Sequence, residues 1–258
     1  MYREATHTEK QRFDEACTRV MYENAAKEGG IGTLGEKTLH AVLKRFYEPD
    51  ETCREIKTGS FYADIKKGDR IIEIQTRAFD KLRKKLDFFL KDYDVTLVYP
   101  VAAVKSIAWI DEKGNISKKR KSPKKGTLHD IYGELYKIRP QLDCDRLHLR
   151  IVLLDITEYR YLDGWSKDKK RGSTRYERIP NGIIGQHYIE SLEEYGDFIP
   201  EGLKEPFTVK DFAKKAKITP YRAGTALNIL NTVGAVTRVG KNKNAYLYER
   251  NVPIYETE

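Results

Sequence analysis

The stretch FYADIKKGDRIIEIQTR, residues 61–77, decides the fold of this chain. Two runs typical of β-strands, residues 60–66 and 70–76, lie on either side of a Gly-Asp turn. The second run is rich in isoleucine, a β-branched residue that favours strands. Each run carries one carboxylate, Asp64 and Glu73. A hairpin built from these runs would bring both carboxylates to one end of the strand pair.

The segments on either side of this hairpin predict an α/β core. Residues 79–90 have leucine and phenylalanine at helical spacing. Residues 94–101 form a continuous apolar run, as is typical of a buried strand in a parallel sheet. Upstream, an apolar stripe predicts a helix from position 33 or 34 to about 46. Residues 33–101 therefore read helix, strand, strand, helix, strand.

Shorter patterns predict the remaining elements of a first domain over residues 1–200. We expect helices at 9–27 and 128–136, a strand at 147–159, and a hairpin between 103–110 and the residues after 115. Residues 160–206 show no assignable pattern apart from a helix near 188–195.

Composition excludes several classes of protein. Hydrophobic residues make up 40% of the 258, which is enough for a core and argues against disorder. No run approaches the ~18 apolar residues of a membrane helix, and the charged first 27 residues do not resemble a signal peptide. Cys17, Cys53 and Cys144 are odd in number and far apart. We therefore expect no disulfide framework, no membrane association and a cytoplasmic location.

Positive charge is concentrated in three segments of the chain. The net charge is +9, and residues 113–126, 165–178 and 207–249 carry +7, +4 and +6, so the remainder is acidic. Patches of this kind attract polyanions, of which nucleic acid is the commonest. For any one patch, the alternative is a basic loop that only keeps the protein soluble.

The pattern changes near residue 205. Thr208 and Asp211 have the spacing of a capping box before one helix, and Thr219 followed by proline begins a second. Two short strands then flank a basic tip at 240–244. This order of helix, turn, helix and two-stranded wing resembles a winged helix-turn-helix domain, here over residues 205–250.

We expect nucleic-acid contacts, above all to double-stranded DNA, from the basic segments and this C-terminal domain. The start of a recognition helix meets base edges and phosphates, and a wing tip contacts the backbone or the minor groove. The candidate residues are Lys118, Lys119, Arg120, Lys121, Lys124, Lys125, Arg171, Arg175, Thr219, Tyr221, Arg222, Thr225, Arg238, Lys241 and Lys243. The alternative for the C-terminal domain is a role in protein interaction or dimerisation.

The carboxylates of the hairpin suit a metal ion. Asp64, Glu73 and a backbone carbonyl near Ile74 are the hard oxygen ligands that Mg²⁺ prefers, with Mn²⁺ as a substitute. A metal held there would activate water and neutralise charge on a phosphodiester. Gln75 shares the strand face of Glu73 and is a candidate to orient the water. The alternative is that both carboxylates are ordinary solvated surface residues.

The order of helix, Asp64, then Glu73 two residues before Gln75, then helix and strand resembles the PD-(D/E)xK nuclease superfamily. The resemblance covers about residues 33–101. It implies a restriction endonuclease-like mixed sheet flanked by helices, with Asp64 and Glu73 as the two carboxylates of the motif.

The same resemblance suggests roles for residues around the carboxylates. It gives Glu36, in the preceding helix, the place of an additional glutamate. His40, four residues after Glu36, shares its helix face. Gln75 stands where the family usually has lysine, and Lys81 is the candidate to supply the missing charge.

The sequence thus predicts a Mg²⁺-dependent DNA endonuclease in which Asp64 and Glu73 hold the metal, and Glu36, Gln75 and Lys81 assist. Cutting both strands would favour a homodimer. One alternative is a nuclease-like DNA-binding protein or regulator that has lost activity, which would bind DNA without metal-dependent cleavage. Another is an adaptor whose winged helix binds protein, which would show no affinity for DNA.

Overall fold

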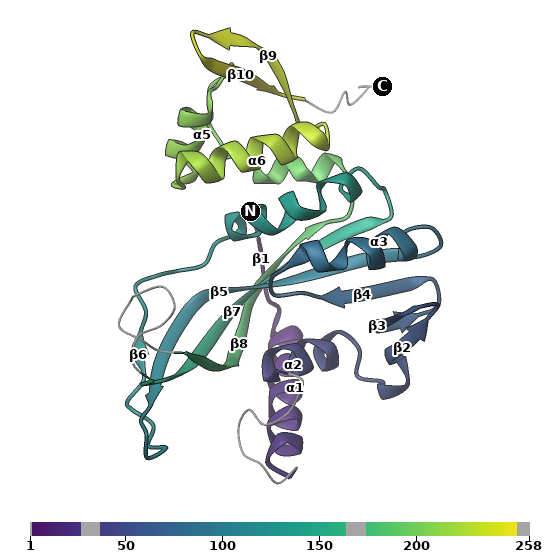
Figure 1. Cartoon of the computed structure of the whole chain (residues 1–258), viewed down its shortest axis with the longest axis vertical. Helices are drawn as coiled ribbons and strands as arrows, with labels where there is room; N and C mark the ends of the chain where they lie inside the picture. The colour runs from purple at the N-terminus through teal and green to yellow at the C-terminus, as the bar shows by residue number, and fades with distance from the viewer. Residues whose placement is uncertain (1, 27–36, 164–173, 252–258) are drawn as a thin grey trace.

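A mixed eight-stranded sheet lies at the centre of the protein, whose computed structural model describes residues 2–26, 37–163 and 174–251 (Figure 1). The strand order is β1-β8-β7-β5-β4-β3-β2, and β6 pairs with β5 outside this path. β5 is parallel to β4 and β7, and the other pairs are antiparallel. The strands are β1 (Arg3–Glu4), β2 (Arg54–Thr58), β3 (Phe61–Lys67), β4 (Arg70–Ile74), β5 (Asp94–Ile110), β6 (Arg120–Lys121), β7 (Leu147–Tyr161) and β8 (Arg175–Ile189).

Helices cover both faces of this sheet, so the α/β class is confirmed. α1 (His7–Ala26) and α2 (Thr38–Tyr47) share one buried cluster with Val152 and Leu154 of β7. Leu149 and Leu153 of the same strand belong to the cluster on the other face, because strand side chains alternate. That cluster includes residues of α3 (Arg83–Phe89), α4 (Tyr132–Leu135) and the 3-10 helices η2 (Phe79–Leu82), η3 (Leu128–Ile131), η4 (Tyr136–Gln141) and η5 (Glu193–Phe198). A further 3-10 turn, η1 (Glu51–Cys53), precedes β2.

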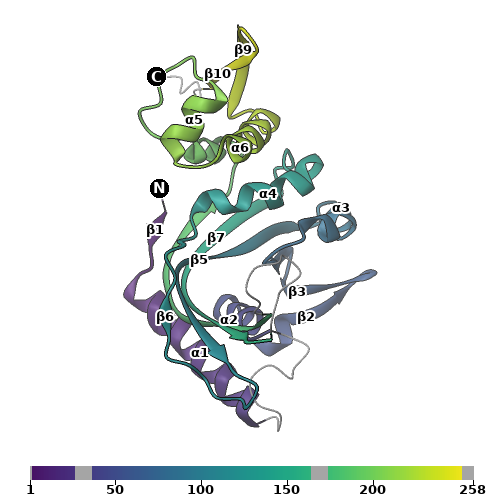
Figure 2. The ribbon, with the colours of Figure 1, turned by 60° about the vertical axis from the view of Figure 1, so that its left-hand side comes forward.

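The strands β5 and β7 are longer than the sequence predicts, and β8 is a strand that the sequence does not predict. β5 continues to Ile110, because it pairs with β7 along its whole length, with one register shift near Ala102. β8 occupies much of the segment that has no assignable sequence pattern. The helix expected near 188–195 is wrong, since Tyr188 pairs with Arg150 of β7. The only helical element that overlaps this stretch, which the structure describes in full, is the 3-10 helix η5. Figure 2 shows these long strands curving along their length.

The C-terminal residues form two helices and a hairpin in the predicted order. α5 (Val209–Ala216) begins with a capping box between Thr208 and Asp211, and α6 (Pro220–Thr232) is capped by the hydroxyl of Thr219. β9 (Val236–Asn242) and β10 (Ala245–Arg250) form an antiparallel pair. This C-terminal unit packs through α6 on α4, and its buried side chains belong to the same cluster as those of α3 and α4.

No helix in the described ranges has the length and apolar character needed to cross a membrane.

Candidate functional site

Asp64 and Glu73 lie where the β3–β4 ladder ends. The pairing runs from Lys67 opposite Arg70 to Ile65 opposite Ile72, and Asp64 and Glu73 would be the next pair. At this point the side-chain carboxylates accept the cross-strand hydrogen bonds in place of backbone carbonyls. The amide of Ile74 donates to Asp64 Oδ2 at 2.7 Å, and the amide of Asp64 donates to Glu73 Oε1 at 3.2 Å. Each carboxylate is therefore held by the backbone of the opposite strand.

Both carboxylates are more buried than solvated surface residues are. Glu73 is 2% exposed, and the side chain of Asp64 is 15% exposed. Lys85 Nζ of α3 lies 2.5 Å from Glu73 Oε2, and His40 Nε2 of α2 lies 3.4 Å from Asp64 Oδ2. The alternative that Asp64 and Glu73 are ordinary solvated residues is therefore wrong. One basic side chain approaches the pair from each face of the sheet.

The two carboxyl groups have opposite pKa shifts. Burial, together with the negative charge of Asp64, raises the pKa of Glu73 to about 7, although Lys85 opposes the change. Burial also acts to raise the pKa of Asp64, but the bond to His40 and the amide of Ile74 outweigh it and hold the pKa below its usual range. Asp64 is thus the ionised member, and its charge resists a second charge on Glu73.

The donor set is compatible with a divalent cation. Asp64 and Glu73 offer hard carboxylate oxygens. A cation between them would remove the repulsion that raises the pKa of Glu73. Within residues 2–26, 37–163 and 174–251, no group of three or more His, Cys, Asp or Glu side chains could hold a metal ion. The predicted helix glutamate, Glu36, lies outside the described residues. Ile74 contacts Asp64 through its backbone amide, whereas the sequence predicts a metal ligand from a backbone carbonyl near Ile74.

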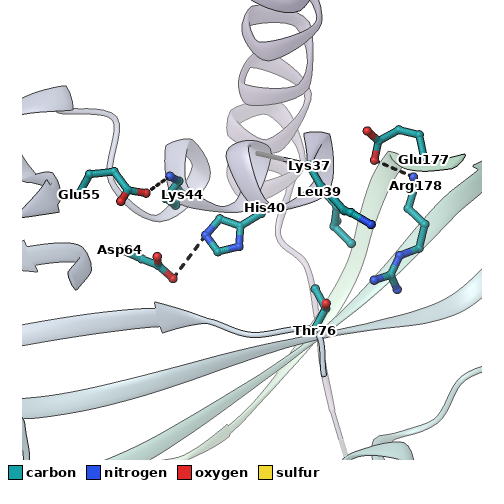
Figure 3. A pocket seen from close by; sticks show the side chains of 9 residues that line it. All are labelled: Lys37, Leu39, His40, Lys44, Glu55, Asp64, Thr76, Glu177 and Arg178. Atoms are coloured by element: carbon teal, nitrogen blue, oxygen red, sulfur yellow. Dashed lines mark hydrogen bonds and ion pairs between the residues drawn. The ribbon is translucent and has the colours of Figure 1, made fainter. Parts of the chain in front are cut away.

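A cavity of about 600 Å³ opens beside the pair, between α2 and the sheet (Figure 3). Asp64 and His40 lie toward one end with Glu55 and Lys44. Thr76, Lys37, Glu177 and Arg178 lie toward the other. The lining combines three carboxylates, Glu55, Asp64 and Glu177, with basic side chains. Such a lining suits an anionic ligand that also contacts a cation. The full lining is Lys37, Leu39, His40, Lys44, Glu55, Asp64, Thr76, Glu177 and Arg178.

The lysine that contacts the pair is Lys85, whereas the sequence favours Lys81. Lys81 is exposed in η2, and Lys85 lies one turn later, on the part of α3 that packs over Glu73. The side-chain amide of Gln75 donates to the carbonyl of Arg77 at 2.6 Å rather than to either carboxylate. In the sequence, Lys85 is recognisable only as one of several basic residues of a helix. Its contact follows from the packing of α3 on the sheet.

The residues predicted to bind nucleic acid lie outside this cavity lining. Some of them are in ion pairs with carboxylates, and others are exposed. Arg175 binds Glu158 at 3.1 Å, and Arg222 binds Asp130 at 2.6 Å, so both are already paired. Arg171 lies outside the described residues. Six others are exposed on β6 and the segments next to it: Lys118, Lys119, Arg120, Lys121, Lys124 and Lys125.

The start of α6 presents a second group of predicted residues. Tyr221 is 85% exposed. The hydroxyl of Thr219 accepts from the backbone of α6, and that of Thr225 donates to a carbonyl one turn earlier. The two threonine hydroxyls are therefore engaged within the helix, and Tyr221 is the freer side chain.

The hairpin of β9 and β10 carries the remaining predicted residues. The Arg238 guanidinium and Lys241 Nζ lie 4.6 and 4.8 Å from the ring centroid of Tyr246. Lys243 is exposed at the tip. The hairpin therefore has a basic and aromatic face.

Comparison with known proteins identifies a family to which no activity is assigned. An uncharacterized protein of Treponema pallidum (strain Nichols) is 28% identical over 230 residues, which cover 86% of this chain and 88% of that protein. No solved structure matches the chain. Residues 37–190 match the model of a family described as a domain of unknown function, DUF8091. This span begins at α2, includes Asp64 and Glu73, and ends after β8. The chain therefore belongs to the DUF8091 family.

Proposed function

We propose that the protein is a metal-dependent nuclease that hydrolyses phosphodiester bonds in DNA, with a restriction endonuclease-like core and a winged helix-turn-helix unit. The observation that carries this proposal is the buried Asp64–Glu73 pair at the open end of β3 and β4, with Lys85 bound to Glu73. Asp64 lines a cavity whose far end carries Lys37 and Arg178 beside Glu177. The resemblance to PD-(D/E)xK nucleases supports the same residues.

In this proposal, Asp64 and Glu73 hold Mg²⁺ or Mn²⁺ together with the predicted carbonyl near Ile74. The metal ion, when bound, lowers the pKa of a water and neutralises charge on the phosphate. Lys85 keeps Glu73 in position and favours its ionised form. Lys85 also supplies the charge that the resemblance expects from a lysine at position 75. Gln75 remains a candidate for positioning the attacking water.

Most of the DNA contacts in this proposal are assigned to surfaces outside the cavity. The exposed lysines near β6 and the hairpin of the C-terminal unit would contact phosphates along a duplex, and their exposure supports this assignment. Arg222 contributes only if it leaves Asp130, since it is paired with that carboxylate. A homodimer would allow both strands to be cut. These contacts predict binding that weakens steeply as salt increases.

One observation favours the inactive, DNA-binding alternative. Gln75 replaces the usual lysine and its side chain is bound to the Arg77 carbonyl, so it supplies no charge at the carboxylates. This alternative predicts the same salt-dependent DNA binding as the nuclease. It differs in predicting no cleavage with any divalent metal.

Cleavage of labelled DNA tests the proposal. Duplex, branched and single-stranded DNA are incubated with Mg²⁺ or Mn²⁺ and wild-type protein, Asp64→Asn or Glu73→Gln. We expect wild-type cutting and a loss of about 100-fold or more in either variant. Asp69→Asn, an exposed carboxylate at the turn of the same hairpin, is the matched control and retains activity. Binding without cutting on every substrate would favour the regulator, and cutting by Asp64→Asn at the wild-type rate would reject the site.

A further inference from the structure

Arg178 of β8 is a partly buried arginine whose guanidinium has no hydrogen-bond or ion-pair partner within the described parts of the chain. Its main-chain amide donates to the carboxylate of Glu177 at 2.9 Å. The guanidinium itself extends away from that carboxylate, toward Thr76 (Figure 3). The cation therefore lies in the cavity rather than in an ion pair.

Besides Glu177, the carboxylate whose charge acts on Arg178 is Glu158, and it is already paired with two other arginines. Glu158 is 2% exposed and binds both Arg160 and Arg175. Burial lowers the pKa of Arg178, and the positive charges of Arg175 and Arg77 lower it further, although the charge of Glu158 opposes the change. A desolvated cation among like charges is unfavourable unless an anion pairs with it. Among the described residues, the guanidinium of Arg178 thus has no ion-pair partner of its own.

The surroundings of Arg178 match a phosphate. The ammonium of Lys37 and the hydroxyl of Thr76 lie toward the same end of the cavity. A guanidinium donates two parallel hydrogen bonds to a phosphate, and a lysine and a hydroxyl can complete the contacts. Two other carboxylates line the cavity. Glu55 is bound to Lys44, and Glu177, at the same end as Arg178, accepts from the main-chain amide of Arg178 rather than from its guanidinium.

We propose that Arg178, with Lys37 and Thr76, forms a subsite for a phosphate of the nucleic-acid strand, next to the phosphate that the metal site would hold. Thr76 follows β4 by two residues, so the subsite lies on the same strand end as the Asp64–Glu73 pair. The nucleic-acid origin of this phosphate rests on the proposed function. The binding of a phosphate group does not, because it depends only on the unpaired cation and the cavity.

A binding measurement under conditions that prevent cleavage separates the claim of a phosphate subsite from the claim that this phosphate belongs to nucleic acid. The protein carries Asp64→Asn and is kept in EDTA, so neither metal nor catalysis contributes. Affinity for a short fluorescent oligonucleotide is measured by anisotropy over a range of salt, with inorganic phosphate as competitor. The variants are Arg178→Gln and Arg178→Lys. The control is Arg70→Gln, which removes an equal charge from the other end of β4.

We expect Arg178→Gln to weaken oligonucleotide binding about tenfold or more and to reduce the salt slope by about one. Arg178→Lys recovers part of the affinity, because it keeps the charge but not the two parallel bonds. Arg70→Gln stays near the parent protein. If Arg178→Gln does not fold, Arg178→Lys provides the same test. We expect inorganic phosphate to stabilise this variant against heat less than it stabilises the parent protein.

Equal affinities for Arg178→Gln and Arg70→Gln would overturn the subsite. Loss of phosphate binding with unchanged oligonucleotide binding would overturn its assignment to nucleic acid. Loss of oligonucleotide binding in a protein whose wild type cuts no DNA with any metal would support the subsite and reject the nuclease.

Discussion

Lys85 favours the ionised form of Glu73 in the carboxylate pair. It is the cation bound to Glu73, and it opposes the rise in pKa that burial and Asp64 produce. We predict that Lys85→Met lowers DNA cleavage about 100-fold, since Glu73 then ionises less readily and a positioned charge is lost. Lys84→Met, at an exposed neighbouring position, is the control. Retained activity in Lys85→Met, with loss in Lys81→Met, would restore the assignment that the sequence favours.

Single residues also show how far the site can be predicted. Asp64 and Glu73 are recognisable because each lies in a strand pattern beside a turn, and the register of a hairpin places them opposite each other. The positions of Lys85 and Arg178 in the site are not recognisable in this way. Their contacts arise from packing, one where α3 lies over β4 and one where β8 reaches the cavity from about 100 residues away in the chain.

At the scale of elements, α1 is joined to the sheet edge by one glutamate. Glu9 accepts two bonds from Arg3, one from the Thr6 amide in a capping arrangement and one from Gln186 of β8. The bond from Arg3 is the largest cause that lowers the pKa of Glu9 to about 2. Because this pKa is below that of the unfolded chain, ionised Glu9 stabilises the native state above about pH 4.5. This stabilisation is lost as the pH falls toward about 2.

We predict that Glu9→Gln lowers the free energy of unfolding by about 1–2 kcal/mol at pH 7, as expected for a lost helix cap and its partners. The variant also loses part of the decline in stability between about pH 4.5 and 2. Urea unfolding followed by circular dichroism over this pH range measures both effects. Glu15→Gln, an exposed site on the same helix, should follow the wild type. An unchanged pH profile in Glu9→Gln would show that Glu9 does not link α1 to the sheet.

Elements are predictable where the pattern is local. β3, β4, α1 and the order of the C-terminal elements follow from the sequence, because turns, caps and alternation specify them within a few residues. β8 does not, since its fifteen residues include Pro180 and two glycines and are held extended by pairing with β7 rather than by propensity. Where β8 pairs, tertiary contacts outweigh the helix that the local sequence around Tyr188 suggests.

At the scale of the whole molecule, the sheet and the C-terminal unit share one core. The sequence favours separate domains with a boundary near residue 205, and the DUF8091 span ends at residue 190. Yet Leu135 of α4 is fully buried in the same cluster as Leu227 and Leu230 of α6, and Arg222 binds Asp130 across the contact. Burial of this kind couples the stability of the parts it joins, so we expect the molecule to unfold as a unit.

Leu135→Ala tests this coupling. The substitution should cost about 2–5 kcal/mol, as is usual for a large side chain removed from a core. Hydrogen exchange in rising urea, read by mass spectrometry, follows peptides of β7 and β9 separately. Because α6 rests on α4, both peptides should lose protection together and at a lower urea concentration than in the wild type. Leu162→Ala, at a side chain that is 50% exposed, should change neither peptide. If β9 kept its protection where β7 had lost it, the C-terminal unit would be an independent domain, and the boundary near residue 205 would hold.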